Sequence, residues 1–279
     1  MYGMLGFFND FLKKNEYNYP SYSIKNLTYI CKLILSLTTV NRQSFLKSII
    51  RHIFVPIFLF SALLGCKDIE EDKRLSEGII EYSVAYPKLD PTSILAELLP
   101  SKMTLTFKED KFTTDLSAGF GMFRLNVISN GDDKEMSQMV KLINERFVVN
   151  YSEVEAIKSN EQLPQMEIEE TGKTKKIAGY LCNEARVTVS GDSIETYLIY
   201  YTKDIRIDHP NWFTQMMNID GVLLEYQVER YNLCSRFTAT SVVPKEIDSE
   251  FFNVPKDYTE ITEAEMNEKM EEIFNNFSE

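Results

Sequence analysis

Hydrophobic and polar residues alternate along most of the chain beyond residue 76. Ile80, Tyr82 and Val84 alternate with polar neighbours, and Glu109-Asp110 marks a turn between two such runs. A period of two is typical of strands with one buried and one solvated face. The same pattern recurs at residues 103–107, 112–116, 123–127, 181–189, 197–201, 224–228 and 237–243. It predicts a mainly antiparallel β domain over residues 76–262.

Two segments fit this pattern less clearly. Residues 136–143 have apolar positions at helical spacing, but every second residue can also share one strand face. We favour a strand, because residues 147–151 would then complete a hairpin. Residues 152–170 are rich in Glu and are predicted to form a loop or an irregular connection.

Helices are predicted at three places. Asp90 can cap a helix over 91–99, and a short helix is expected near 210–217. Thr262 and Glu265 form a capping box for an amphipathic helix over 263–279, whose Met and Phe stripe either packs on the body or binds a partner. A sheet with one apolar face needs a cover, and two or three helices suit a twisted, half-open barrel. The expected fold class is therefore α+β, with β dominant.

A leader precedes this domain. Residues 53–65 carry no charge, follow a basic stretch and end at Cys66. Thirteen residues span about 20 Å as a helix, which is too short for a bilayer core of about 30 Å. Leu63-Leu64-Gly65-Cys66 resembles the lipobox of bacterial lipoproteins, which implies that 40–65 is a signal peptide and that Cys66 carries the lipid. The alternative is a short anchor helix followed by an incidental Cys.

The segments on either side of this leader leave alternatives open. Residues 1–39 do not fit a signal peptide, and they are either an over-extended start, with translation beginning near Val40, or a genuine cytoplasmic extension. Residues 66–75 form an acidic tether, which is either a plain spacer or a signal for surface export.

Charge and composition narrow the function classes. Residues 1–65 hold 7 of the 30 basic and 2 of the 42 acidic residues, so the remainder has a net charge of −17. Such a body repels phosphate backbones, so we expect no nucleic-acid partner. Past Cys66 the chain has a single histidine, His209, and no phosphate loop or nucleophile elbow. We therefore expect no enzyme activity, no cofactor and no metal site.

Cys182 and Cys234 remain once Cys66 is assigned to lipid. Export leads to an oxidising compartment, where leftover thiols often pair. Both cysteines fall on the polar parity of their strands. They are expected either to form a disulfide or to stay as two independent buried thiols.

Four motifs in order resemble a family of Gram-negative, Bacteroidetes-type lipoproteins that is a domain of unknown function. They are residues 174–185, 200–204, 220–226 and 252–258, and the resemblance covers 76–262. The family's fold resembles the half-barrel of the outer-membrane lipoprotein carrier (LolA-like). The resemblance implies that fold and a lipid-anchored place in the cell envelope, at the outer membrane, with no catalytic residues.

Two functions follow as hypotheses. In the first, the half-barrel of a lipid-anchored module binds an acyl chain or another apolar ligand. The residues predicted to line the site are Phe107, Phe123, Trp212, Met216 and Tyr226. In the second, an envelope structural or interaction lipoprotein fills the concavity with its own side chains. The membrane, reached through the lipid anchor, is the expected partner in both.

Overall fold

The computed structural model describes residues 72–276 except 192, 193 and 232. Residues 72–279 form one compact unit. The predicted N-terminal extension, signal peptide, Cys66 lipidation site and first part of the tether lie outside the described residues. Within the described part, no helix is long and apolar enough to cross a membrane.

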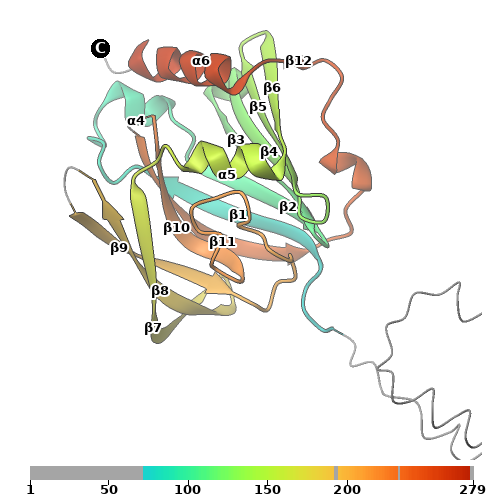
Figure 1. The fold of residues 1–279 in the computed structure, drawn as a ribbon, viewed down its shortest axis with the longest axis vertical. Helices are drawn as coiled ribbons and strands as arrows, with labels where there is room; N and C mark the ends of the chain where they lie inside the picture. Colours follow the sequence, from blue (N-terminus) through green and yellow to red (C-terminus); the bar gives the residue numbers. More distant parts are fainter. Residues whose placement is uncertain (1–71, 192–193, 232, 277–279) are drawn as a thin grey trace, which may run out of the picture. The chain divides into compact units, whose positions relative to one another are not determined.

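Twelve strands make up a single sheet in the described part of the chain (Figure 1). They are β1 (Glu77–Ala85), β2 (Lys102–Lys108), β3 (Lys111–Ala118), β4 (Phe123–Asn130), β5 (Glu135–Leu142), β6 (Glu145–Tyr151), β7 (Gln165–Ile177), β8 (Tyr180–Ser190), β9 (Ile194–Thr202), β10 (Val222–Arg230), β11 (Leu233–Pro244) and β12 (Thr259–Glu260). Their order is β12-β6-β5-β4-β3-β2-β1-β11-β10-β9-β8-β7. The mainly antiparallel β prediction is confirmed, as is the strand assignment of 136–142.

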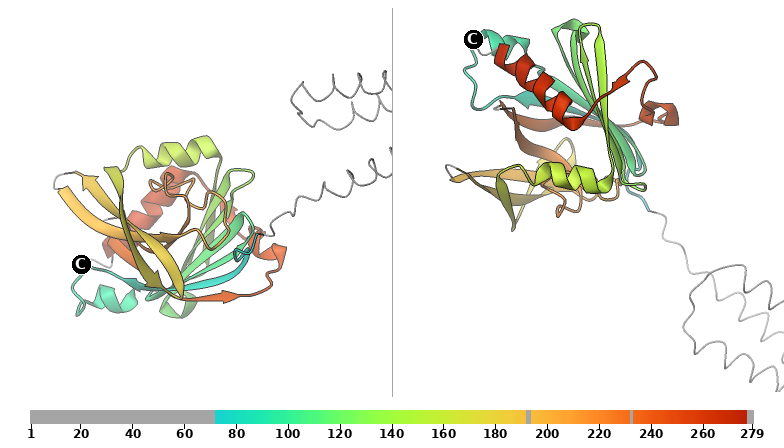
Figure 2. Two further views of the ribbon diagram at one scale, coloured as in Figure 1. Left: turned by 90° about the horizontal axis from the view of Figure 1, so that it is seen from below. Right: turned by 45° about the horizontal axis from the view of Figure 1, so that its top comes forward.

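The sheet curls but does not close into a barrel. Its outermost strands, β12 and β7, are not paired with each other, and only the short β12–β6 contact is parallel. Figure 2 shows the strands β2–β6 and β7–β10 as two walls around a concave side. Strong coiling of this kind follows from the right-handed twist of individual strands.

Helices cover part of the concave side. They are α4 (Ile94–Leu98), α5 (Glu153–Asn160) and α6 (Glu263–Asn276), with 3-10 turns η1 (Gly119–Gly121) and η2 (Ser249–Phe252). Since α5 connects β6 to β7, it crosses from one side of the sheet order to the other (Figures 1 and 2).

The predicted C-terminal helix is α6, and its capping box is present. The Thr262 amide donates to Glu265 at 2.8 Å, and the Glu265 amide donates to the Thr262 hydroxyl at 3.3 Å. Met266 and Met270 are buried in one cluster with Val140 of β5. The apolar stripe of α6 therefore packs on the body.

Two predictions for local structure were wrong. Residues 152–170 are not a loop but hold α5 and the start of β7, and α5 begins with a capping box of Ser152 and Glu155. Residues 210–217 form successive turns and no helix. Asn211 and Thr214 explain the second difference, because their side chains bind nearby backbone groups and compete with helical hydrogen bonds. The helix expected over 91–99 is shorter, since residues 91–93 form turns.

A long connection between β9 and β10 enters the concave side. We call residues 203–221 the plug. Its Ile205 lies in one buried cluster with Ile80 of β1 and Phe107 of β2. The Asn211 side chain donates to the carbonyls of Ile219 at 2.9 Å and Gly221 at 3.0 Å, which fixes the folded shape of the plug. One end of the concave side is thus filled by the chain itself.

Candidate functional site

A cavity of about 390 Å³ lies where the plug does not fill the concave side. Strands β1 to β5, β10 and β11 supply most of its wall, and its cover comes from α5, the plug and Met270 of α6. The strand residues are mainly apolar and include Met103, Leu105, Leu116, Phe123, Leu125, Val127, Met136 and Phe237. A volume of this size falls in the range of about 300–1,000 Å³ that is typical of small-molecule sites.

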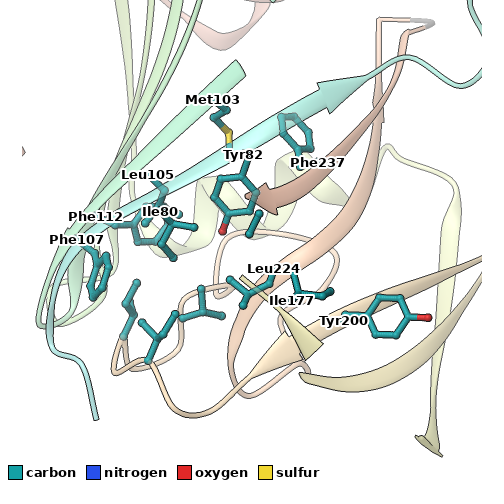
Figure 3. Close-up of a cluster of buried hydrophobic side chains, with 14 of the residues drawn as sticks. Ile80, Tyr82, Met103, Leu105, Phe107, Phe112, Ile177, Tyr200, Leu224 and Phe237 are labelled. Atoms are coloured by element: carbon teal, nitrogen blue, oxygen red, sulfur yellow. The ribbon is translucent and has the colours of Figure 1, made fainter. Parts of the chain in front are cut away.

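Three aromatic rings form the floor of the cavity. Tyr226 stacks on Phe237 with ring centroids 4.9 Å apart and meets Tyr82 edge-on at 6.1 Å. The Tyr82 hydroxyl donates to the Leu223 carbonyl at 2.8 Å. Figure 3 shows Tyr82 pointing from β1 toward Leu224.

The hydroxyl of Tyr226 differs from that of Tyr82. It has no hydrogen-bond partner among the described residues, and Tyr226 borders the cavity. Desolvation by burial raises the pKa of Tyr226 well above its ordinary value. The Tyr226 hydroxyl is therefore neutral and can form a hydrogen bond with a ligand in the cavity.

The cover is tied together by hydrogen bonds between the plug and the α5 region. Asn160 donates to the Phe213 carbonyl at 2.9 Å, and Gln215 donates to the Pro164 carbonyl at 2.7 Å. Phe213 also contacts Phe112 of β3, with ring centroids 6.0 Å apart. The plug is thereby held against the α5 region and against β3.

Of the five predicted lining residues, Phe123, Met216 and Tyr226 border the cavity. Phe107 does not, because it is fully buried at the filled end of the concave side. Trp212 also does not border it. Its indole N–H donates to the Ser129 hydroxyl at 3.0 Å, so the ring is directed into the cluster of β5, β6 and α6.

Several lining residues were missed in the sequence. Leu125 and Val127 share the strand face of Phe123, so the period of two could have identified them. Phe213 lines the cavity in place of its neighbour Trp212. No sequence signal distinguishes these two, because the plug forms turns and the helical spacing assumed for it does not apply.

The two cysteines are both free and buried, so the disulfide is not formed. Cys182 lies on β8 and Cys234 on β11, with β9 and β10 between them. Three strand spacings amount to roughly 14 Å, whereas a disulfide needs Cα atoms within about 7 Å. Burial raises the pKa of the Cys182 thiol to about 11, which makes it a poor nucleophile.

The described residues contain no group of three or more His, Cys, Asp or Glu side chains arranged to hold a metal ion. His209 is exposed in a turn with a positive φ of 51°. The cavity combines a concave shape with a mainly apolar wall, which together suit a small-molecule ligand.

Comparison with known proteins gives a family match for part of the chain. A search of curated proteins gives no match. Residues 93–218, from just before α4 to the plug, match the family described as Domain of unknown function (DUF4412). This stretch includes β2 to β9, and therefore one wall and much of the cover of the cavity. Residues 93–218 are thus similar to a family of unknown function.

Proposed function

We propose that this protein is a lipid-anchored lipoprotein of the cell envelope that binds an apolar ligand, such as an acyl chain, in the cavity of its curled sheet. The observation that carries the proposal is the cavity of about 390 Å³ with its mainly apolar wall. Transfer of an acyl chain from water to such a wall is favourable by about 25 cal/mol per Å² of buried apolar surface.

Other observations support the proposed location and fold type. Leu63-Leu64-Gly65-Cys66 resembles a lipobox, and an acidic tether follows it. A mostly antiparallel sheet that curls without closing agrees with a LolA-like half-barrel. We place the protein at the outer membrane on the strength of this resemblance.

The second candidate is an envelope structural or interaction lipoprotein without a ligand. The filled end of the concave side favours it, because Ile80, Phe107 and Leu224 are fully buried by the protein itself. The two functions differ in one measurable respect, which is whether the remaining cavity takes up an acyl chain.

The only tryptophan of the chain allows a direct binding test. Trp212 contacts Phe213, a cavity residue, with ring centroids 5.4 Å apart. Purified, unlipidated residues 72–279 should therefore transfer Trp fluorescence to bound cis-parinaric acid, a fluorescent fatty acid, in a saturable way. Absence of saturable binding across several chain lengths would contradict the acyl-chain proposal.

A matched pair of variants locates this binding. Met216→Trp should fill the cavity and abolish the emission of bound cis-parinaric acid, excited directly. Met217→Trp is the control, because its neighbouring side chain is 42% exposed and does not line the cavity. Equal binding by both variants would place the ligand elsewhere.

The anchor needs a separate test in cells. Cys66→Ser should remove the lipid acceptor and leave an uncleaved or soluble precursor. Membrane fractionation and mass spectrometry of the N-terminal peptide measure this. A variant that stays in the membrane fraction at the wild-type level would overturn the lipidation of Cys66.

A further inference from the structure

We propose that the ligand is an amphiphile with one negatively charged head group, which lies at Arg230 at the end of the cavity while the apolar chain runs along β10 toward Tyr226. This inference rests on the proposed function and adds the chemical class of the ligand. Four observations carry it: the strand geometry, the charges of the lining residues, the partner of Arg230 and the state of Tyr151.

The strand geometry gives the cavity a direction. Tyr226, Val228 and Arg230 follow one another on one face of β10, because side chains on a strand alternate between faces. Their partners on β11 are Phe237, Ser235 and Leu233, and all six residues line the cavity. Four residues of strand span about 13 Å. The wall therefore changes from stacked aromatic rings to a guanidinium over this length.

Only two of the lining residues are charged, Glu229 and Arg230. Glu229 lies 2.9 Å from Lys88, whose ammonium it shares with Glu195 at 2.6 Å. Arg230 makes no ion pair among the described residues, and its guanidinium carbon lies 5.8 Å from the centroid of the Tyr231 ring. Arg230 is therefore the one positively charged residue of the cavity lining.

Tyr151 supplies a second donor beside Arg230. It is 5% exposed and lines the cavity, and its hydroxyl has no hydrogen-bond partner among the described residues. Burial raises the pKa of Tyr151, the carboxylate of Glu263 adds to this rise and the charge of Arg230 opposes it, so both charges act on this hydroxyl. Tyr151 lines the cavity, so its hydroxyl can donate a hydrogen bond to a ligand there. An anionic head group would accept a hydrogen bond from it and pair with the guanidinium at the same time.

The net charge of the protein bears on where a preference for an anionic ligand can come from. A chain with 42 acidic and 30 basic residues does not attract anions through its overall field. A preference for an anionic ligand must therefore come from local groups. A guanidinium binds carboxylate or phosphate through paired N–H donors, whereas a neutral head group leaves it unpaired.

The test compares ligands with equal chains and different heads. The affinities of dodecanoic acid, dodecyl phosphate and 1-dodecanol are measured by displacement of the neutral methyl ester of cis-parinaric acid. We expect the wild type to bind the anions about tenfold more tightly than the alcohol, in line with a charge-assisted hydrogen bond. The anion with the higher affinity then identifies the head as carboxylate or phosphate.

Variants assign the preference to Arg230. Arg230→Gln should abolish the anion preference and leave the affinity for 1-dodecanol unchanged. Arg146→Gln is the matched control, because Arg146 pairs with Asp257 on the other face of β6 and does not line the cavity. It should keep the wild-type preference.

The outcomes separate the two proposals. If the wild type binds none of the ligands, the acyl-chain function itself fails. If it binds the alcohol and the anions equally, or if Arg230→Gln keeps the preference, the head-group assignment is overturned and the acyl-chain function stands.

Discussion

The two ends of the concave side differ although the same strands build both. Phe107 of β2 and Phe123 of β4 both point toward the concave side, yet Phe107 is 0% exposed and lies away from the cavity, whereas Phe123 is partly exposed and lines it. Phe107 belongs to one buried cluster with the plug residue Ile205 and Leu224 of β10. Figure 3 shows Phe107 and Leu224 within this cluster. Phe123 instead packs against the cluster of β5, β6 and α6 and borders the cavity.

The difference shows that the plug, and not the strands, decides where the cavity lies. Its position depends on polar contacts that are remote in sequence, such as Trp212 to Ser129 at 3.0 Å. Asn211 holds both limbs of the plug together through two backbone carbonyls. The filled end stabilises the fold, while the open end keeps apolar surface available to a ligand.

Truncation of the two phenylalanines should give the largest contrast in stability. Phe107→Ala removes a fully buried ring and should lower the free energy of unfolding by about 3–5 kcal/mol. Phe123→Ala should cost only about 1–2 kcal/mol, because its ring already borders empty space and loses fewer contacts. Urea unfolding of both variants measures this. Equal losses would mean that the open end is packed as tightly as the filled end.

A substitution of Gly221, at the end of the plug, should give the next largest loss of stability. Gly221 has a φ of 155°, and a Cβ there would lie 2.7 Å from the Thr202 carbonyl oxygen. Gly221→Ala should therefore cost about 1–3 kcal/mol, since either the plug or β9 must shift. Gly191→Ala is the control, because it has open space around its Cα and no positive φ. Thermal unfolding that leaves both variants at the wild-type midpoint would argue against a fixed plug.

The strands at both ends of the concave side could be predicted from the sequence. The segments that cover them, α5 and the plug, could not. A period of two identified most of the strands because each buries one face against the concave side. The start of β7 was missed because only Met166 and Ile168 are apolar there, in an otherwise charged strand at the edge of the sheet. The capping box of Ser152 and Glu155 was present in the sequence and marks α5.

The alternation of buried and exposed residues also gave a wrong prediction at the start of β8. Leu181 shares the parity of Ala185, which predicts burial, but it is 62% exposed, whereas Cys182 is 0% exposed. Cys182 belongs to the cluster of Leu224 and Ile177, on the face that the sequence pattern marks as polar. Period-two patterns assume one buried face along the whole strand, and a curled sheet can bury different faces at the two ends of a strand.

Only part of the candidate site was predicted from the sequence, because some of its residues lie on strands and others lie in the plug. Phe123 and Tyr226 lie on strands, where parity fixes the face, and both line the cavity. Trp212 lies in the plug, where the direction of each side chain depends on turns and on a partner in β4. The strands therefore define the face that lines the cavity, and long-range contacts define which part of that face remains open.

The smallest expected effect concerns two tyrosines that meet where the filled and open ends join. Tyr82→Phe removes the hydrogen bond to the Leu223 carbonyl and should lower the free energy of unfolding by about 1–2 kcal/mol. Tyr226→Phe should change it by less than about 0.5 kcal/mol, because its hydroxyl has no partner among the described residues and no hydrogen bond is lost. Both variants keep the aromatic rings, so the T-shaped contact at 6.1 Å is preserved and the comparison isolates the hydroxyl groups. Urea unfolding of the ligand-free protein gives both values. A loss at Tyr226 as large as that at Tyr82 would mean that the hydroxyl of the open end is already satisfied, and that this end offers a ligand no unpaired donor on its floor.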